Sequence, residues 1–183
     1  MDVDERDLLL QFLWTRDAED TIDTPEKLKT WLVGLGLLRS DESVSEADVR
    51  LARHFRAATR SLCAANNGMP LDERTNKVIA QINEVAPLKV TVRPYGRLDV
   101  EPGGTGVARA LSSILAVGYK ATVTGEFPRF KACKGCGWAY YDESKNSSRR
   151  WCDMGVCGSK TKVRAFRERQ KAAKAGGDPG LIH

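Results

Sequence analysis

The sequence has only two histidines, His54 and His183, among its 183 residues. No Ser-His-Asp or Cys-His constellation is visible with so few, and nucleophilic hydrolases depend on such arrangements. His54 falls in a helical pattern without a cysteine or carboxylate partner, so we expect a structural role for it. The run of residues 103–106, Gly-Gly-Thr-Gly, lacks the Gly-Lys-Ser/Thr ending of a phosphate-binding loop. We therefore predict that the protein is not an enzyme.

Long apolar runs are also absent. No run reaches the roughly 18 residues of a membrane-spanning helix, and the most apolar stretch, residues 107–117, contains Arg109 and two serines. The first five residues, Met-Asp-Val-Asp-Glu, are acidic, whereas a secretory signal begins with basic residues. We therefore expect no membrane partner and a cytoplasmic location.

Cysteine is scarce but concentrated, because four of the five cysteines lie between residues 133 and 157 in the pattern Cys-x2-Cys-x15-Cys-x4-Cys. Two close pairs separated by a loop suit a tetrahedral zinc site with four thiolate ligands. Four protein ligands leave no open position, so the ion is structural. We predict one structural Zn²⁺ bound by Cys133, Cys136, Cys152 and Cys157. Cys63 stands apart and reads as a small buried hydrophobe.

The net charge of +5 is unevenly distributed. Residues 129–174 hold 13 Lys or Arg and 4 Asp or Glu, a net of +9, whereas the rest of the chain has a net of −4. A basic C-terminal module on an acidic body favours a polyanionic partner for the module.

The N-terminal part has mostly helical periodicity. Thr24-Pro25 and the capping box from Ser45 to Asp48 predict two helix starts. Apolar residues alternate over residues 88–92 and again over 98–100, on either side of Pro94-Tyr95-Gly96, which predicts a β-hairpin. We therefore expect an α+β protein with a mostly helical domain at 1–125, a zinc module at 126–175 and a flexible tail at 176–183.

The zinc module has the order of a treble clef, with a knuckle at Cys133–Gly137, then a hairpin, then a helix. We expect Trp138–Tyr140 to pair with a return strand at Arg149–Trp151, and Cys157 to sit at the start of a helix over residues 159–175. In that helix, basic residues recur at intervals of four, three, four and three, which places them in one stripe. They are Lys160, Arg164, Arg167, Lys171 and Lys174. Val163, Phe166 and Ala173 lie on another face and are expected to pack on the zinc hairpin.

Such a helix can neutralise phosphates or enter a major groove. The predicted nucleic-acid contacts are Arg149, Arg150, Lys160, Arg164, Arg167 and Lys171. DNA is the first expectation for the partner. A solvated helix face, an RNA-binding protein and an adaptor that docks on an acidic protein are the open alternatives. For the N-terminal domain, a homodimer contact, a protein partner and a ligand also stay open.

The polar residues between the cysteines extend the pattern. The matching positions are Cys133, Cys136, Tyr141, Asp142, Ser144, Lys145, Asn146, Ser148, Arg149, Arg150, Trp151, Cys152, Met154, Cys157 and Gly158. This run resembles the CGNR zinc-finger family, and the N-terminal part resembles that family's partner domain, ABATE, through Phe12-Leu13-x-Thr15 and Trp31. The resemblance implies a stress-induced transcription regulator. The chain departs from the family pattern at Ser159-Lys160, in place of Asn-Arg, and at Trp14, where the family usually has Asn.

Overall fold

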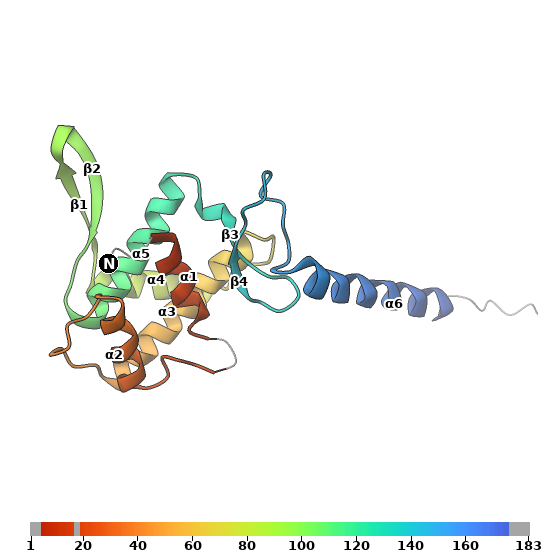
Figure 1. Cartoon of the computed structure of the whole chain (residues 1–183), viewed down its shortest axis with the longest axis horizontal. Coiled ribbons are helices and arrows are strands. Elements are labelled where there is room, and N and C mark those ends of the chain that lie inside the picture. The colour runs from red at the N-terminus through yellow and green to blue at the C-terminus, as the bar shows by residue number, and fades with distance from the viewer. Residues whose placement is uncertain (1–4, 17–18, 176–183) are drawn as a thin grey trace, which may run out of the picture.

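The structure, a computed structural model, describes residues 5–16 and 19–175 and is shown in Figure 1. It is α+β, as predicted, and combines α-helices with two small antiparallel sheets, β1–β2 and β3–β4. No helix in the described ranges is long and apolar enough to cross a membrane. In chain order the main elements are α1 (Glu5–Trp14), α2 (Pro25–Gly34), α3 (Glu46–Ala65), α4 (Arg74–Val85), β1 (Leu88–Arg93), β2 (Arg97–Pro102), α5 (Gly106–Val123), β3 (Phe130–Ala132), β4 (Ala139–Tyr141) and α6 (Ser159–Ala175).

The predicted helix starts of α2 and α3 are confirmed. The Thr24 side chain accepts a hydrogen bond from the backbone N–H of Lys27, and Ser45 and Asp48 form a complete capping box. These bonds satisfy N–H groups that have no partner within the helix. Helix α4 begins after Glu73, and the Asp72 side chain accepts a hydrogen bond from the N–H of Arg74.

The predicted hairpin is β1–β2, with Val90 opposite Val100 in the register. Its turn needs two residues with positive φ, Tyr95 at 65° and Gly96 at 73°. The hairpin projects from the helical body in Figure 1. Its pairing follows from the period-two pattern, but its exposed valines show that this sheet does not cover the core, since Val90 and Val92 are 69% and 74% exposed.

The hydrophobic core extends from the helices into the zinc module. Phe12, Phe55 and Leu111 belong to the same cluster of buried residues as Phe130 of β3 and Ala139 of β4. Strand β3 packs on α3, and β4 packs on α1. The predicted division at residues 125 and 126 stays a prediction, and the elements on its two sides bury apolar surface against one another.

Helix α6 has the predicted bounds but not the predicted packing. It extends away from the body in Figure 1 and packs at its start against η3 (Met154–Gly158), a π-helical turn. The expectation that its apolar face packs on the zinc hairpin is wrong for Val163 and Phe166, which are 48% and 54% exposed. The side chains of Ala173 and Lys174, and the predicted tail at 176–183, lie outside the described residues.

Candidate metal centre and basic surface

The four clustered cysteines come from three segments of the zinc module. Cys133 follows β3, and Cys136 lies in the turn that leads to β4, where Gly137 has a φ of 75° that favours glycine. Cys152 follows an irregular segment, and Cys157 lies in η3 immediately before α6. The predicted return strand at residues 149–151 is therefore wrong. Strand β4 pairs instead with β3, so the knuckle forms the loop of the hairpin.

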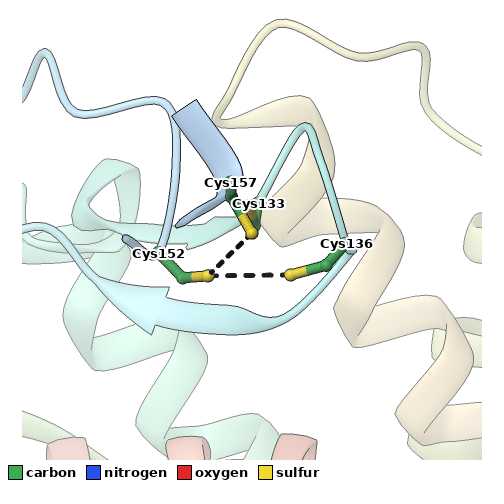
Figure 2. Close-up of side chains that lie close together, drawn as sticks. All are labelled: Cys133, Cys136, Cys152 and Cys157. Carbon is green, nitrogen blue, oxygen red and sulfur yellow. Dashed lines mark hydrogen bonds between the residues drawn. The ribbon is translucent and has the colours of Figure 1, made fainter. Parts of the chain in front are cut away.

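The sulfur atoms converge, as Figure 2 shows, and all lie within 4.8 Å of one another. The Cys136 Sγ is 3.6 Å from the Cys152 Sγ, which is 3.8 Å from the Cys157 Sγ. Zinc–sulfur bonds of about 2.3 Å in a tetrahedron place the sulfurs about 3.8 Å apart. All four thiols are free, so the separations fit ligands around one ion and not disulfides. Within residues 5–16 and 19–175, no other group of His, Cys, Asp or Glu side chains converges in this way.

The thiols of this cluster titrate unequally. Burial alone would raise the pKa of Cys133, but hydrogen bonds from the backbone N–H groups of Cys152, Cys136 and Gly135 lower that pKa to about 7. Burial raises the pKa of Cys152, and a hydrogen bond with Cys136 raises the pKa of Cys157. Crowded thiols resist simultaneous ionisation, and a divalent cation removes this resistance because each ligand binds as a thiolate.

The loop between β4 and Cys152 is ordered by a buried ion pair that sequence reasoning did not identify. The Lys131 ammonium donates to the Asp142 carboxylate at 2.7 Å, and these side chains are 6% and 0% exposed. Asp142 also accepts from the hydroxyl and N–H of Ser144 and from the N–H of Arg149. Lys131 donates in addition to the carbonyls of Ser147 and Arg149. The pair therefore fixes the backbone path that delivers Cys152.

Two asparagines that follow α3, Asn66 and Asn67, bind the zinc module through their side-chain amides. The Asn66 amide donates to the carbonyls of Phe127 and Phe130, and the Asn67 amide donates to those of Ala132 and Arg150. The segment Asn66-Asn67-Gly68 follows the last residue of α3, with Asn66 as the C-cap. These four long-range hydrogen bonds were not predictable from the local sequence, because the partner carbonyls lie more than 60 residues away in the chain.

The predicted nucleic-acid contacts fall into two groups. Lys160 and Arg164 share with Lys134 a hollow of about 520 Å³ beside Cys136 and Cys157, so the knuckle and the start of α6 present positive charge together. Arg167 and Lys171 continue the same side of α6 and line the adjoining hollow. All four predicted α6 side chains are exposed.

The other two predicted contacts, Arg149 and Arg150, precede Cys152. The Arg149 guanidinium lies 5.1 Å from the centre of the Tyr140 ring and donates to the Trp151 carbonyl, so it also has a structural role. Arg150 is exposed. On α6, Arg164 pairs with Glu168 at 3.0 Å, but both side chains are exposed, so the pair contributes little and leaves Arg164 accessible.

Comparison with known families accounts for nearly the whole described chain. The family model ABATE, described as "Putative stress-induced transcription regulator", matches residues 6–126. The CGNR zinc-finger model matches residues 129–170. No curated protein matches the chain. The zinc-finger match and the four-cysteine cluster together support one structural zinc ion.

Proposed function

The chain belongs to the ABATE family and carries a CGNR zinc finger, and from this premise we propose that it regulates transcription by binding duplex DNA through α6 and the zinc module. The observation that carries the proposal is the placement of α6. This helix stands clear of the body and presents Lys160, Arg164, Arg167 and Lys171 along one side.

The dimensions of α6 suit a major groove. Its 17 residues span roughly 25 Å at about 1.5 Å per residue. A helix is about 10–12 Å across, and the major groove is about 12 Å wide. Basic side chains on such a helix displace counterions from phosphates, which makes the affinity depend steeply on salt.

Zinc has a structural role in this proposal. The proposed ligands are Cys133, Cys136, Cys152 and Cys157, and they close the coordination sphere without leaving a site for substrate. Because Cys157 lies in the turn that starts α6, the ion fixes the base of the helix relative to the knuckle. We propose that the protein acts by binding and not by catalysis.

The test is a salt series of duplex DNA affinities for the zinc-loaded protein. Arg164→Glu with Arg167→Glu is expected to weaken binding at least tenfold and to reduce the salt slope by about two, near 0.9 per lost phosphate contact. A charge-matched control, Lys77→Glu with Arg97→Glu, changes two exposed residues away from the zinc module. Equal losses in both variants, or no loss in the first, would contradict the proposal.

A protein-adaptor function is the second candidate, and the exposed Val163 and Phe166 on α6 favour it. An adaptor would dock the basic side of α6 on an acidic protein, with these apolar side chains adding to the contact, and would have no measurable affinity for duplex DNA. RNA binding would instead show as preferential competition by duplex or single-stranded RNA over duplex DNA. The duplex DNA titration, with RNA competitors added, therefore separates the three functions.

A further inference from the structure

A second basic site lies on the helical body, outside the predicted nucleic-acid contacts. It is a hollow of about 350 Å³ lined almost entirely by cationic or basic side chains. The lining residues are Arg16, Arg50, Arg53, His54, Arg56, Ala57 and Arg60. Positions 50, 53, 54 and 57 follow helical spacing on one face of α3, and Arg16 comes from the segment after α1. His54, predicted to be structural, is exposed at this hollow.

Two arginines at the floor of the hollow, Arg56 and Arg60, are held in fixed positions by hydrogen bonds. Arg56 is 3% exposed and binds both carboxylate oxygens of Asp20, at 2.9 and 2.6 Å, as well as the Thr15 hydroxyl. The Arg60 guanidinium donates to the carbonyls of Leu13 and Gly137. These two arginines are thus held in place by the fold. Arg60 also connects the hollow to the zinc knuckle, where Gly137 lies.

Among the residues that the structure describes, positive charges outnumber negative charges at the hollow. Asp20 pairs with Arg56 and lies 3.4 Å from Arg53, so one carboxylate serves two guanidiniums. Within residues 5–16 and 19–175, Arg16 and Arg50 have no ion-pair partner. Burial lowers the pKa of Arg60, and the positive charges of Arg16 and Arg56 lower it further. The pKa of Asp20 is lowered, first by its hydrogen bond with Arg56.

We propose that this hollow binds a phosphate oxyanion through Arg16, Arg50 and Arg53. A guanidinium group can donate two parallel hydrogen bonds to two oxygens of one phosphate. A hollow lined by excess positive charge also attracts such an anion electrostatically. The volume lies within the range of small-molecule sites, about 300–1,000 Å³. A solvated helix face would spread these side chains into water, whereas here they surround a hollow with a fixed floor. Arg56 and Arg60 are positioning residues that set this floor.

The phosphate can come from a free phosphorylated compound or from a nucleic-acid backbone, and two titrations distinguish the sources. The first uses inorganic pyrophosphate and the second uses duplex DNA, both with the full zinc-loaded chain. The test variant is Arg16→Gln with Arg50→Gln, and the matched control is Lys77→Gln with Arg97→Gln. Zinc content and circular dichroism before and after each titration confirm that both variants stay folded. Arg50→Lys, which keeps the charge but loses the paired donors, is the fallback if the double variant does not fold.

We expect pyrophosphate to bind the wild type and the control, and its affinity to fall about tenfold or more in the test variant, as for the loss of charged hydrogen bonds. That result assigns the site to a free phosphate compound. Pyrophosphate that does not bind, with duplex DNA affinity reduced in the test variant alone, would assign it to backbone phosphate. Unchanged affinity for both probes would overturn the inference. The α6 variant Arg164→Glu with Arg167→Glu is expected to keep pyrophosphate binding, so the two proposals fail independently.

Discussion

The indole of Trp14, at the end of α1, stacks on the indole of Trp138 beside the zinc knuckle. The ring centres are 5.8 Å apart and the planes differ by 15°. The Trp14 Nε1 also donates to the Ala139 carbonyl at 2.8 Å. Position 14 is where the chain departs from the Asn of the family pattern. Here the substituted residue joins the N-terminal helix to the zinc hairpin across 125 positions of sequence.

Removing the contact between Trp14 and Trp138 is expected to destabilise the zinc module. Trp14→Ala removes both the stacking and the hydrogen bond and should cost about 2 kcal/mol of unfolding free energy, less than a fully buried Trp because the residue is 38% exposed. Trp14→Phe keeps an aromatic ring and loses the donor, so about 1 kcal/mol is expected. Urea unfolding of the zinc-loaded protein measures both. Wild-type stability in Trp14→Ala would show that the contact does not hold the module.

A feature of this fold was predictable from the sequence when it depends on residues that are close together in the chain. The caps at Thr24 and Ser45, the β1–β2 hairpin and the bounds of α6 depend on neighbours in the sequence, so they were predictable. The cysteine spacing also identified the four residues that converge. The partner of β4 was not predictable, because Phe130–Ala132 gives only a three-residue strand and Arg149–Trp151 is an equally apt candidate by sequence. The contacts of Asn66, Asn67 and Trp14 depend on tertiary packing, which no local pattern encodes.

The Lys131–Asp142 pair should be the most costly polar contact to break. Asp142→Asn removes the negative charge and leaves the Lys131 ammonium buried without a counter-charge, for an expected loss of about 3 kcal/mol in unfolding free energy. Asp41→Asn is the control, because Asp41 pairs with Arg39 at the surface, where the loss should stay below about 1 kcal/mol. Similar losses for the two variants in urea unfolding would contradict this account of the loop.

The metal ligands can be tested by zinc stoichiometry. Cys152→Ser removes one of four thiolates, so the purified protein should lose stoichiometric zinc and the order of the zinc module. Cys63→Ala is the control, since this cysteine is fully buried in the helical core and lies outside the cluster. Metal analysis of both proteins measures the zinc bound per chain. Full zinc content with native stability in Cys152→Ser would disprove ligation by four cysteines.

Truncation of the two phenylalanines Phe166 and Phe130 should lower stability to very different extents. Phe166→Ala changes a side chain that is 54% exposed on α6, so the unfolding free energy should fall by less than about 1 kcal/mol. Phe130→Ala leaves a cavity in the core that α3 and β3 share, where the residue is 1% exposed, and should cost about 3–5 kcal/mol. A large loss from Phe166→Ala would mean that the apolar face of α6 packs on the molecule in solution.

The buried thiol of Cys63 should report opening of the helical core. Burial raises its pKa from 9.0 to about 12, so at pH 9 the native thiol stays protonated while the thiol of an unfolded chain is half ionised. Only the thiolate is alkylated, so reaction with iodoacetamide at pH 9 should be slow in the native protein and fast in urea. The free energy of unfolding should therefore fall as the pH rises from 9 toward 12, because the unfolded chain releases the thiol proton first.

The variant Cys152→Ser, which loosens the zinc module, tests whether the zinc module and the helical core open together. Fast alkylation of Cys63 in that variant would show one cooperative unit, and slow alkylation would show that the helical core persists without zinc.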